Sequence, residues 1–300
     1  MTIEATSGGL PAGSCDCHIH VFEDAERYPF ATVRSFTPGG ALLDSFLQTA
    51  GAVGIDRAVI VQPSVYGTDN SCLADAIARF PDRLRGIAVI DAQTTDDTLQ
   101  HLQAGGVRGI RLNLVSTGAA GAEAAQQAIE EAARRALPLG WHLQLFMRVA
   151  LLDALEEVIR RLPVDVVFDH MGFPDAKLGV GQPGFAALQR LLAEGRCWVK
   201  LAGVYHVAEE DLGNSHVDRL ARHLVMHFPE RLLWGSDWPH IAKHARKIQA
   251  VPERVGFRDI RYASLVALLE GWVDDSPSAL EQILVRNPVR LYGFAEPRLS

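Results

Sequence analysis

The chain has 300 residues, of which 48% are hydrophobic and 22% charged, a composition typical of a folded globular protein. No apolar run is long enough to span a membrane, residues 1–13 lack the basic flank and apolar core of a secretory signal, and the four cysteines form no CxxC pair, so we expect a cytoplasmic protein with no membrane partner. The formal net charge of −7, without a basic stripe, argues against nucleic acid as a partner.

Short β-branched apolar runs alternate with segments of helical periodicity along the whole chain, a pattern that predicts parallel βα units. The expected strands are 15–22, 58–62, 85–91, 109–114, 141–146, 164–170, 197–202 and 232–236. The expected helices are 42–53, 70–80, 94–104, 122–137, 149–161, 184–193 and 216–227, followed by 261–269 and 278–286.

Eight strands, each followed by a helix, indicate a closed (β/α)₈ TIM barrel of the α/β class. An open doubly wound sheet that binds a nucleotide usually has a Gly-rich phosphate loop after its first strand, and the sequence contains none there. We therefore expect one barrel domain over residues 1–300, with residues 1–14 as an extended arm. The segment 23–40 is expected to be a long loop beside the site.

Polar side chains gather where three of the expected strands end. His18 and His20 lie two apart on the first strand and so point to the same face, His170 ends the sixth strand, and Asp237 follows the eighth. Burying several polar groups together at one end of a barrel costs free energy, which indicates that they have a function. These four residues are therefore the predicted catalytic set.

The same residues lie in motifs that resemble the amidohydrolase superfamily. Within that superfamily, the chain is similar to the 2-pyrone-4,6-dicarboxylate lactonase group in VQPSVYGTDN (61–70), RGIRLNL (108–114), FDHMGFPDA (168–176) and WGSDWPH (234–240). The similarity extends from about residue 15 to residue 292. It implies a lactone hydrolase in which Asp237 takes a proton from water, while His18, His20 and His170 polarise the carbonyl and stabilise the oxyanion.

The cofactor is left open by this resemblance. The fourth strand offers Arg111 and Asn113 in place of the lysine or glutamate that bridges two metals in many amidohydrolases, so a binuclear site is not expected. The pyrone-dicarboxylate lactonases work without a divalent metal, yet three imidazoles and one carboxylate could hold one ion. We expect either no required metal or one Zn²⁺ held by His18, His20, His170 and Asp237.

The substrate pocket departs from the pyrone-dicarboxylate lactonases. Arg111 and Ser64 match residues of that group that contact the substrate, but aligned tyrosine and arginine positions are occupied here by Phe36, Thr117, Phe146, Phe173 and His206. Asn113, Tyr66 and His240 lie beside motif residues and are further candidates for the pocket. The substitutions favour a more apolar pocket with one clamp for a carboxylate, and hence a small acidic lactone such as a muconolactone from aromatic breakdown.

Three alternatives use the same residues. A lactone isomerase would move the acyl group without adding water, and a metal-dependent decarboxylase of aromatic acids shares the constellation. A binding protein without activity would have no need of a base beside an electrophile. The expected partner is a small-molecule lactone, with a homo-oligomer as a further possibility.

Overall fold

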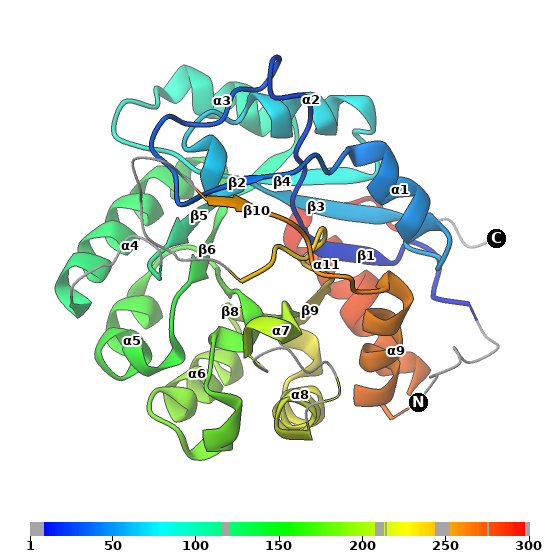
Figure 1. The fold of residues 1–300 in the computed structure, drawn as a ribbon. Helices are drawn as coiled ribbons and strands as arrows, with labels where there is room; N and C mark the ends of the chain where they lie inside the picture. The colour runs from blue at the N-terminus through cyan, green and yellow to red at the C-terminus, as the bar shows by residue number, and fades with distance from the viewer. Residues whose placement is uncertain are drawn as a thin grey trace.

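In the computed structural model, eight parallel strands form one sheet that curves into a barrel, with helices around its outside (Figure 1). The structure describes residues 9–115, 121–207, 213, 215–243, 253–274 and 276–297. The strands follow each other around the barrel in chain order: β1 (Cys15–Ile19), β3 (Arg57–Val61), β4 (Leu84–Ala88), β5 (Val107–Asn113), β6 (His142–Phe146), β7 (Val166–Phe168), β8 (Cys197–Ala202) and β9 (Leu232–Gly235). This confirms the predicted (β/α)₈ architecture.

The barrel closes between β1 and β9, directly at two of the predicted catalytic residues. His20 N donates to Trp238 O at 2.8 Å and Asp237 N donates to His18 O at 2.9 Å. Two residues before His18 on β1, the buried Asp16 carboxylate accepts from the backbone N–H groups of His18 and Ser236, each at 3.0 Å. Barrel closure therefore fixes the backbone positions of His18 and Asp237 through backbone hydrogen bonds.

Amphipathic helices cover the outside of the sheet and bury their apolar faces against it. They are α1 (Leu43–Gly51), α2 (Ser71–Arg79), α3 (Asp96–Ala104), α4 (Ala122–Ala136), α5 (Leu152–Arg161), α6 (Phe185–Ala193), α7 (Val204–Val207), α8 (Ser215–His227) and α9 (Tyr262–Trp272). The chain continues through α10 (Pro277–Glu281), a π-helical turn over Gln282–Arg286 and α11 (Asn287–Tyr292). The predicted helices are confirmed with ends that differ by a few residues.

Three details differ from the sequence-based expectation. The first predicted strand, 15–22, ends at Ile19, so His20 lies just beyond its end. The sixth predicted strand, 164–170, is shorter, because the chain leaves the sheet after Phe168 and His170 adopts a positive φ of 51°. The predicted loop 23–40 contains a short strand, β2 (Phe36–Pro38), which pairs in parallel with β10 (Glu253–Val255) from the loop after β9. Such a pair joins segments distant in sequence, so local periodicity cannot reveal it.

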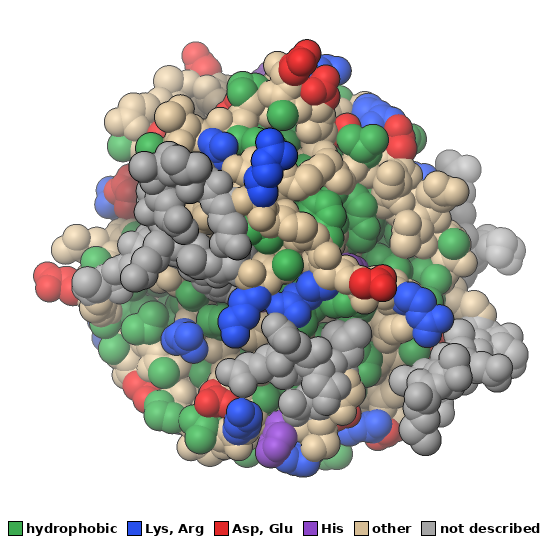
Figure 2. Space-filling view, in the orientation of Figure 1, with side chains coloured by type: hydrophobic (Ala, Val, Ile, Leu, Met, Phe, Trp, Pro, Cys, Tyr) green, Lys and Arg blue, Asp and Glu red, His purple; other side chains and the backbone are tan. Residues whose placement is uncertain are grey.

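Figure 2 shows the face that carries β2, β10 and α7, with Lys and Arg side chains gathered across its middle. None of the described helices has the length and apolar character required to cross a membrane. Of the predicted N-terminal arm, residues 1–8 lie outside the described part, and the single-domain assignment stays a prediction.

Candidate active site

The four predicted catalytic side chains meet at the carboxyl ends of β1, β7 and β9. His18 Nε2 and His20 Nε2 each lie 3.5 Å from Asp237 Oδ1, and the rings of His18 and His170 are 5.0 Å apart between centroids. All four side chains are buried. The structure thus brings together residues that are distant along the chain, as the strand-end argument predicted.

The backbone around these residues is strained in a way that marks a site. Among the described residues, six other than glycine have positive φ, and five of these follow β7 or β9: His170, Met171, Phe173, Asp237 and His240. Non-glycine residues rarely adopt this conformation, and such strained residues cluster at functional sites, where the surrounding structure holds them in place. Gly203, with φ 58°, leaves room for the His170 ring, since a Cβ there would come within 2.4 Å of His170 Nδ1.

The second oxygen of Asp237 is held by two donors that follow β8. Tyr205 OH donates to Asp237 Oδ2 at 2.6 Å, and His206 Nε2 lies 3.0 Å from the same oxygen. Burial alone would raise the pKa of Asp237, but the nearby His170 and the hydrogen bonds from His20 and His206 hold it well below its usual range. Asp237 is therefore ionised, with Oδ1 directed at the histidines of β1.

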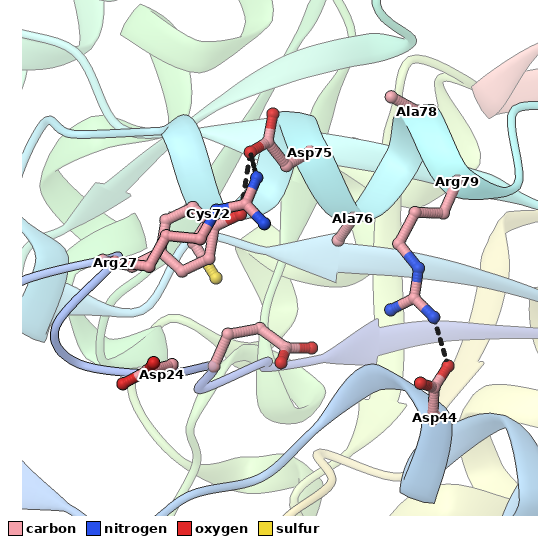
Figure 3. Close-up of a pocket in the computed structure, with 10 residues that line it drawn as sticks. Asp24, Arg27, Asp44, Cys72, Asp75, Ala76, Ala78 and Arg79 are labelled. Atoms are coloured by element: carbon pink, nitrogen blue, oxygen red, sulfur yellow. Dashed lines mark hydrogen bonds and ion pairs between the residues drawn. The ribbon is translucent and has the colours of Figure 1, made fainter.

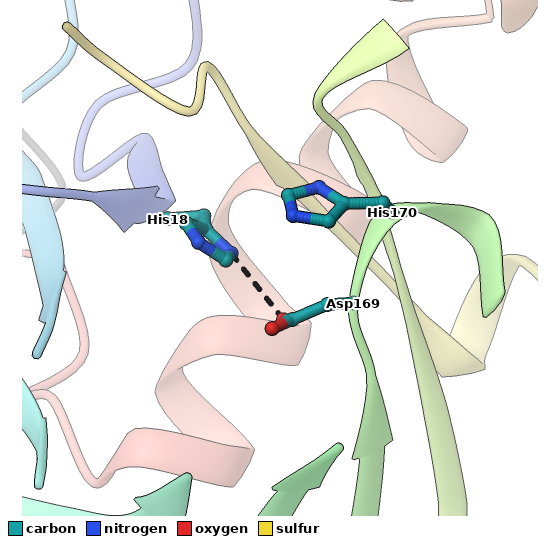
Figure 4. Close-up of side chains that lie close together, drawn as sticks. All are labelled: His18, Asp169 and His170. Atoms are coloured by element: carbon teal, nitrogen blue, oxygen red, sulfur yellow. Dashed lines mark ion pairs between the residues drawn. The ribbon is translucent and has the colours of Figure 1, made fainter. Parts of the chain in front are cut away.

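The partners of His18 and His20 fix where each ring carries its proton. His20 Nδ1 lies 2.8 Å from the carbonyl oxygen of Val61, and His18 Nδ1 lies 3.3 Å from Asp169 Oδ1 (Figure 4). Both partners can only accept, so both rings carry hydrogen on Nδ1. Burial lowers the pKa of His18 to about 4, which keeps the ring neutral. Both Nε2 atoms face Asp237 Oδ1, each at 3.5 Å.

A second row of polar side chains lies behind His18, inside the barrel. Asp169 Oδ2 accepts from Gln144 Nε2 at 3.2 Å and lies 3.4 Å from Arg111 Nε, while Lys200 Nζ donates to Gln144 Oε1 at 2.6 Å. Burial would raise the pKa of Asp169, but His18, Lys200 and Arg111 hold it well below its usual range. Burial lowers the pKa of Lys200 to about 8.

The catalytic set predicted from the sequence does not include Asp169, Gln144, Lys200 or Tyr205. A signal was available for two of them, because Lys200 interrupts an apolar strand and Asp169 directly precedes His170. The partners of Gln144 and Tyr205 depend on which strands become neighbours, which is a tertiary property.

The pocket beside Asp237 Oδ1 has a volume of about 70 Å³. Its lining includes most of the predicted substrate contacts: Phe36, Ser64, Arg111, Asn113, Phe146 and His206. Phe173 packs behind Phe146, with 5.1 Å between ring centroids.

Two predicted contacts, Tyr66 and His240, lie elsewhere. Tyr66 follows Ser64 by two residues but turns away from the pocket, and its buried ring lies 5.2 Å from Phe30. His240 lines a neighbouring cavity of about 610 Å³ together with Trp238. Thr117 falls outside the described residues.

The model of the family described as Amidohydrolase matches residues 15–294. The chain belongs to this amidohydrolase family. A 2-pyrone-4,6-dicarboxylate hydrolase from Comamonas testosteroni is 34% identical over 240 residues, covering 77% of this chain and 78% of the relative. A 4-sulfomuconolactone hydrolase from Rhizobium radiobacter is 32% identical, covering 96% and 92% of the two chains. A D-galactarolactone isomerase from Agrobacterium fabrum is 30% identical, covering 97% and 94%.

The site of this amidohydrolase has the donor set of a cation site. His18 Nε2, His20 Nε2 and Asp237 Oδ1 converge within a few ångströms, and each can serve as a metal ligand. Two imidazoles and a carboxylate, each with its remote atom held by a second partner, suit one divalent ion.

A larger cavity of about 670 Å³ lies apart from this site, beside α2 (Figure 3). Four of its charged side chains form ion pairs with one another: Arg27 with Asp75 at 2.7 Å, and Arg79 with Asp44 at 2.5 Å. It contains none of the predicted site residues. Size alone therefore does not identify the active site of the amidohydrolase.

Proposed function

We propose that this amidohydrolase opens the ring of small acidic lactones by adding water to the ester carbonyl. The observation that carries the proposal is the arrangement of Asp237, an ionised carboxylate whose Oδ2 is held by Tyr205 and His206 while Oδ1 faces the pocket and the β1 histidines. A base needs an oxygen directed at the water it deprotonates, and Oδ1 provides it.

The chemistry then follows in two proton transfers. Asp237 Oδ1 takes a proton from water as the oxygen attacks the lactone carbonyl, which becomes a tetrahedral oxyanion. His170 lines the pocket on the β7 side of His18 and can donate a hydrogen bond to that oxyanion. The carbon–oxygen bond of the ring breaks, Asp237 returns its proton to the leaving oxygen, and the new carboxylic acid releases one proton at neutral pH.

Substrate recognition is assigned to Arg111, Ser64 and Asn113, with Phe36 and Phe146 as apolar walls. A guanidinium matches a carboxylate or sulfonate, whereas phenylalanine offers no partner to the hydroxyl groups of a sugar. The related hydrolases are named for a pyrone dicarboxylate and a sulfomuconolactone, both of which are anionic lactones. Basic side chains across the middle of this face would also attract anions (Figure 2).

One divalent ion, with zinc as the choice for an imidazole-rich set, is proposed at His18, His20 and Asp237, with His170 beside them. When bound, it would act as a Lewis acid on the carbonyl and increase the acidity of water. The alternative to this ion is a proton on Nε2 of His18 or His20, which would interact with Asp237 Oδ1. Metal analysis of the purified protein distinguishes a bound divalent ion from a protonated histidine.

The test is a panel of acidic lactones, including muconolactone and 2-pyrone-4,6-dicarboxylate, followed by proton release at constant pH and by product mass. Hydrolysis increases the mass by one water. The isomerase relative makes acyl migration the rival activity, and a product of unchanged mass would establish that activity instead. Release of carbon dioxide from aromatic acids would establish a decarboxylase. No turnover across the panel would refute the proposal.

A further inference from the structure

Lys200 is a buried charged group for which the proposed reaction has no use. It lies in the middle of β8, its side chain is fully buried inside the barrel, and it donates to Gln144 Oε1 at 2.6 Å. Lysine is almost never fully buried unless it is paired. Its nearest carboxylate is Asp169, with 3.9 Å between Nζ and Oδ1.

Asp169 is shared between two cations. Its Oδ2 lies 3.4 Å from Arg111 Nε, and its Oδ1 faces both His18 and Lys200. If Asp169 faced Arg111 alone, the carboxylate would largely cancel the charge of the guanidinium, and a substrate anion would gain little from it. With Lys200 on the same carboxylate, this group of three carries one net positive charge.

Two other buried carboxylates, Asp16 and Asp237, lie nearby and are held by donors of their own; Asp16 accepts from Tyr262 OH and from two backbone N–H groups. Asp237 lies on the far side of the His18 ring, at Nε2, while Asp169 lies at Nδ1. Asp237 also has its own donors in Tyr205 and His206. Gln144 links Lys200 to Asp169, since its amide donates to Asp169 Oδ2 while its oxygen accepts from Lys200.

We propose that Lys200 is a positioning residue for substrate selectivity: by sharing Asp169 through Gln144, it keeps Arg111 available to bind the acidic group of the lactone. This inference rests on the proposed lactone hydrolysis. It adds that the buried Lys200 and Asp169 cause the enzyme to prefer a negatively charged substrate. Lys200 itself touches no substrate.

The test compares an acidic lactone with its neutral methyl ester in wild type and in Lys200→Met, which removes the charge with little change in length. The ratio of kcat/KM for acid over ester should fall on the order of tenfold or more, mainly through KM for the acid. Lys177→Met is the matched control, because it removes the same charge from an exposed side chain in the loop after β7. That control should keep the wild-type ratio.

A merely structural role of Lys200 would lower turnover of both substrates equally and leave the ratio unchanged, which would overturn the inference while leaving lactone hydrolysis established. Failure of wild type to hydrolyse either lactone would instead refute the proposed function. The competitive inhibition constant of isophthalate, a stable planar dicarboxylate, should rise in Lys200→Met to a similar extent.

The double variant Asp169→Asn/Lys200→Met covers the case in which Lys200→Met does not fold. Removing both charges leaves Arg111 without a carboxylate to cancel it, so discrimination in favour of the acid should return towards the wild-type ratio, even though the loss of the His18 partner lowers kcat for both substrates. A ratio in the double variant close to one would overturn the inference.

Discussion

Replacing Asp237 with asparagine is the most direct test of the site, because the structure predicts how the amide will be oriented. Tyr205 OH and His206 Nε2 donate to the position of Oδ2, whereas the neutral His18 ring presents its Nε2 lone pair to the position of Oδ1. The amide oxygen therefore takes the first position and the NH₂ group the second. Every neighbour of the side chain keeps or gains a partner.

The expected effect on activity is large and that on stability is small. Removing a general base lowers kcat by about 10² to 10⁴ fold, or roughly 3–5 kcal/mol in the activation free energy. The hydrogen bonds from Tyr205 and His206 become weaker without the charge, but the variant no longer buries a carboxylate, so the free energy of unfolding should change by less than about 2 kcal/mol. Asp237→Asn should thus fold and bind substrate without turning it over.

The assay is proton release from an acidic lactone, combined with urea unfolding of the same samples. Asp165→Asn is the matched control: Asp165 precedes β7 at the other end of the barrel, where its carboxylate accepts from Trp198 Nε1 at 2.9 Å. That variant should keep wild-type kcat. A kcat for Asp237→Asn within about threefold of the control would refute the assignment of Asp237 as the base.

Further predictions concern the neighbours of this base, a surface network and the cation. Tyr205→Phe removes the 2.6 Å hydrogen bond to Asp237 and should lower kcat about tenfold or more with little change in the far-UV spectrum; an unchanged kcat would show that Oδ1 needs no orientation from Oδ2. On the surface, hydrogen bonds from Arg190, and then from Arg160, lower the pKa of Glu156 from 4.5 to about 2. The stabilisation by this carboxylate is present above pH 4.5 and is lost as the pH falls through about 2, so Glu156→Gln should lower the urea midpoint at pH 7 but not near pH 2; an equal loss at both pH values would contradict the linkage. Purified protein should contain about one equivalent of a divalent ion by elemental analysis, and chelation should lower kcat until zinc is returned; full activity below a tenth of an equivalent would show that no metal is needed.

Much of the fold could be predicted from the sequence because the signals are local. Each buried strand appears as a short apolar run and each outer helix as an amphipathic one, so the order of elements followed from periodicity. The structure confirmed this order and corrected its ends, most clearly at the strand expected over 164–170. The pairing of β2 with β10 had no such signal, since it depends on contact between the loops after β1 and β9.

The sequence by itself determined which chemistry is available: His18, His20, His170 and Asp237 at strand ends, in motifs of the amidohydrolase family. Only the tertiary structure decided how these groups are used. Barrel closure places Asp237 Oδ1 against the Nε2 atoms of His18 and His20, and it places Asp169 between Arg111 and Lys200. The physical reason is that proton positions, pKa values and charge balance depend on which atoms are neighbours across strands, and residues distant along the chain become neighbours only when the barrel forms.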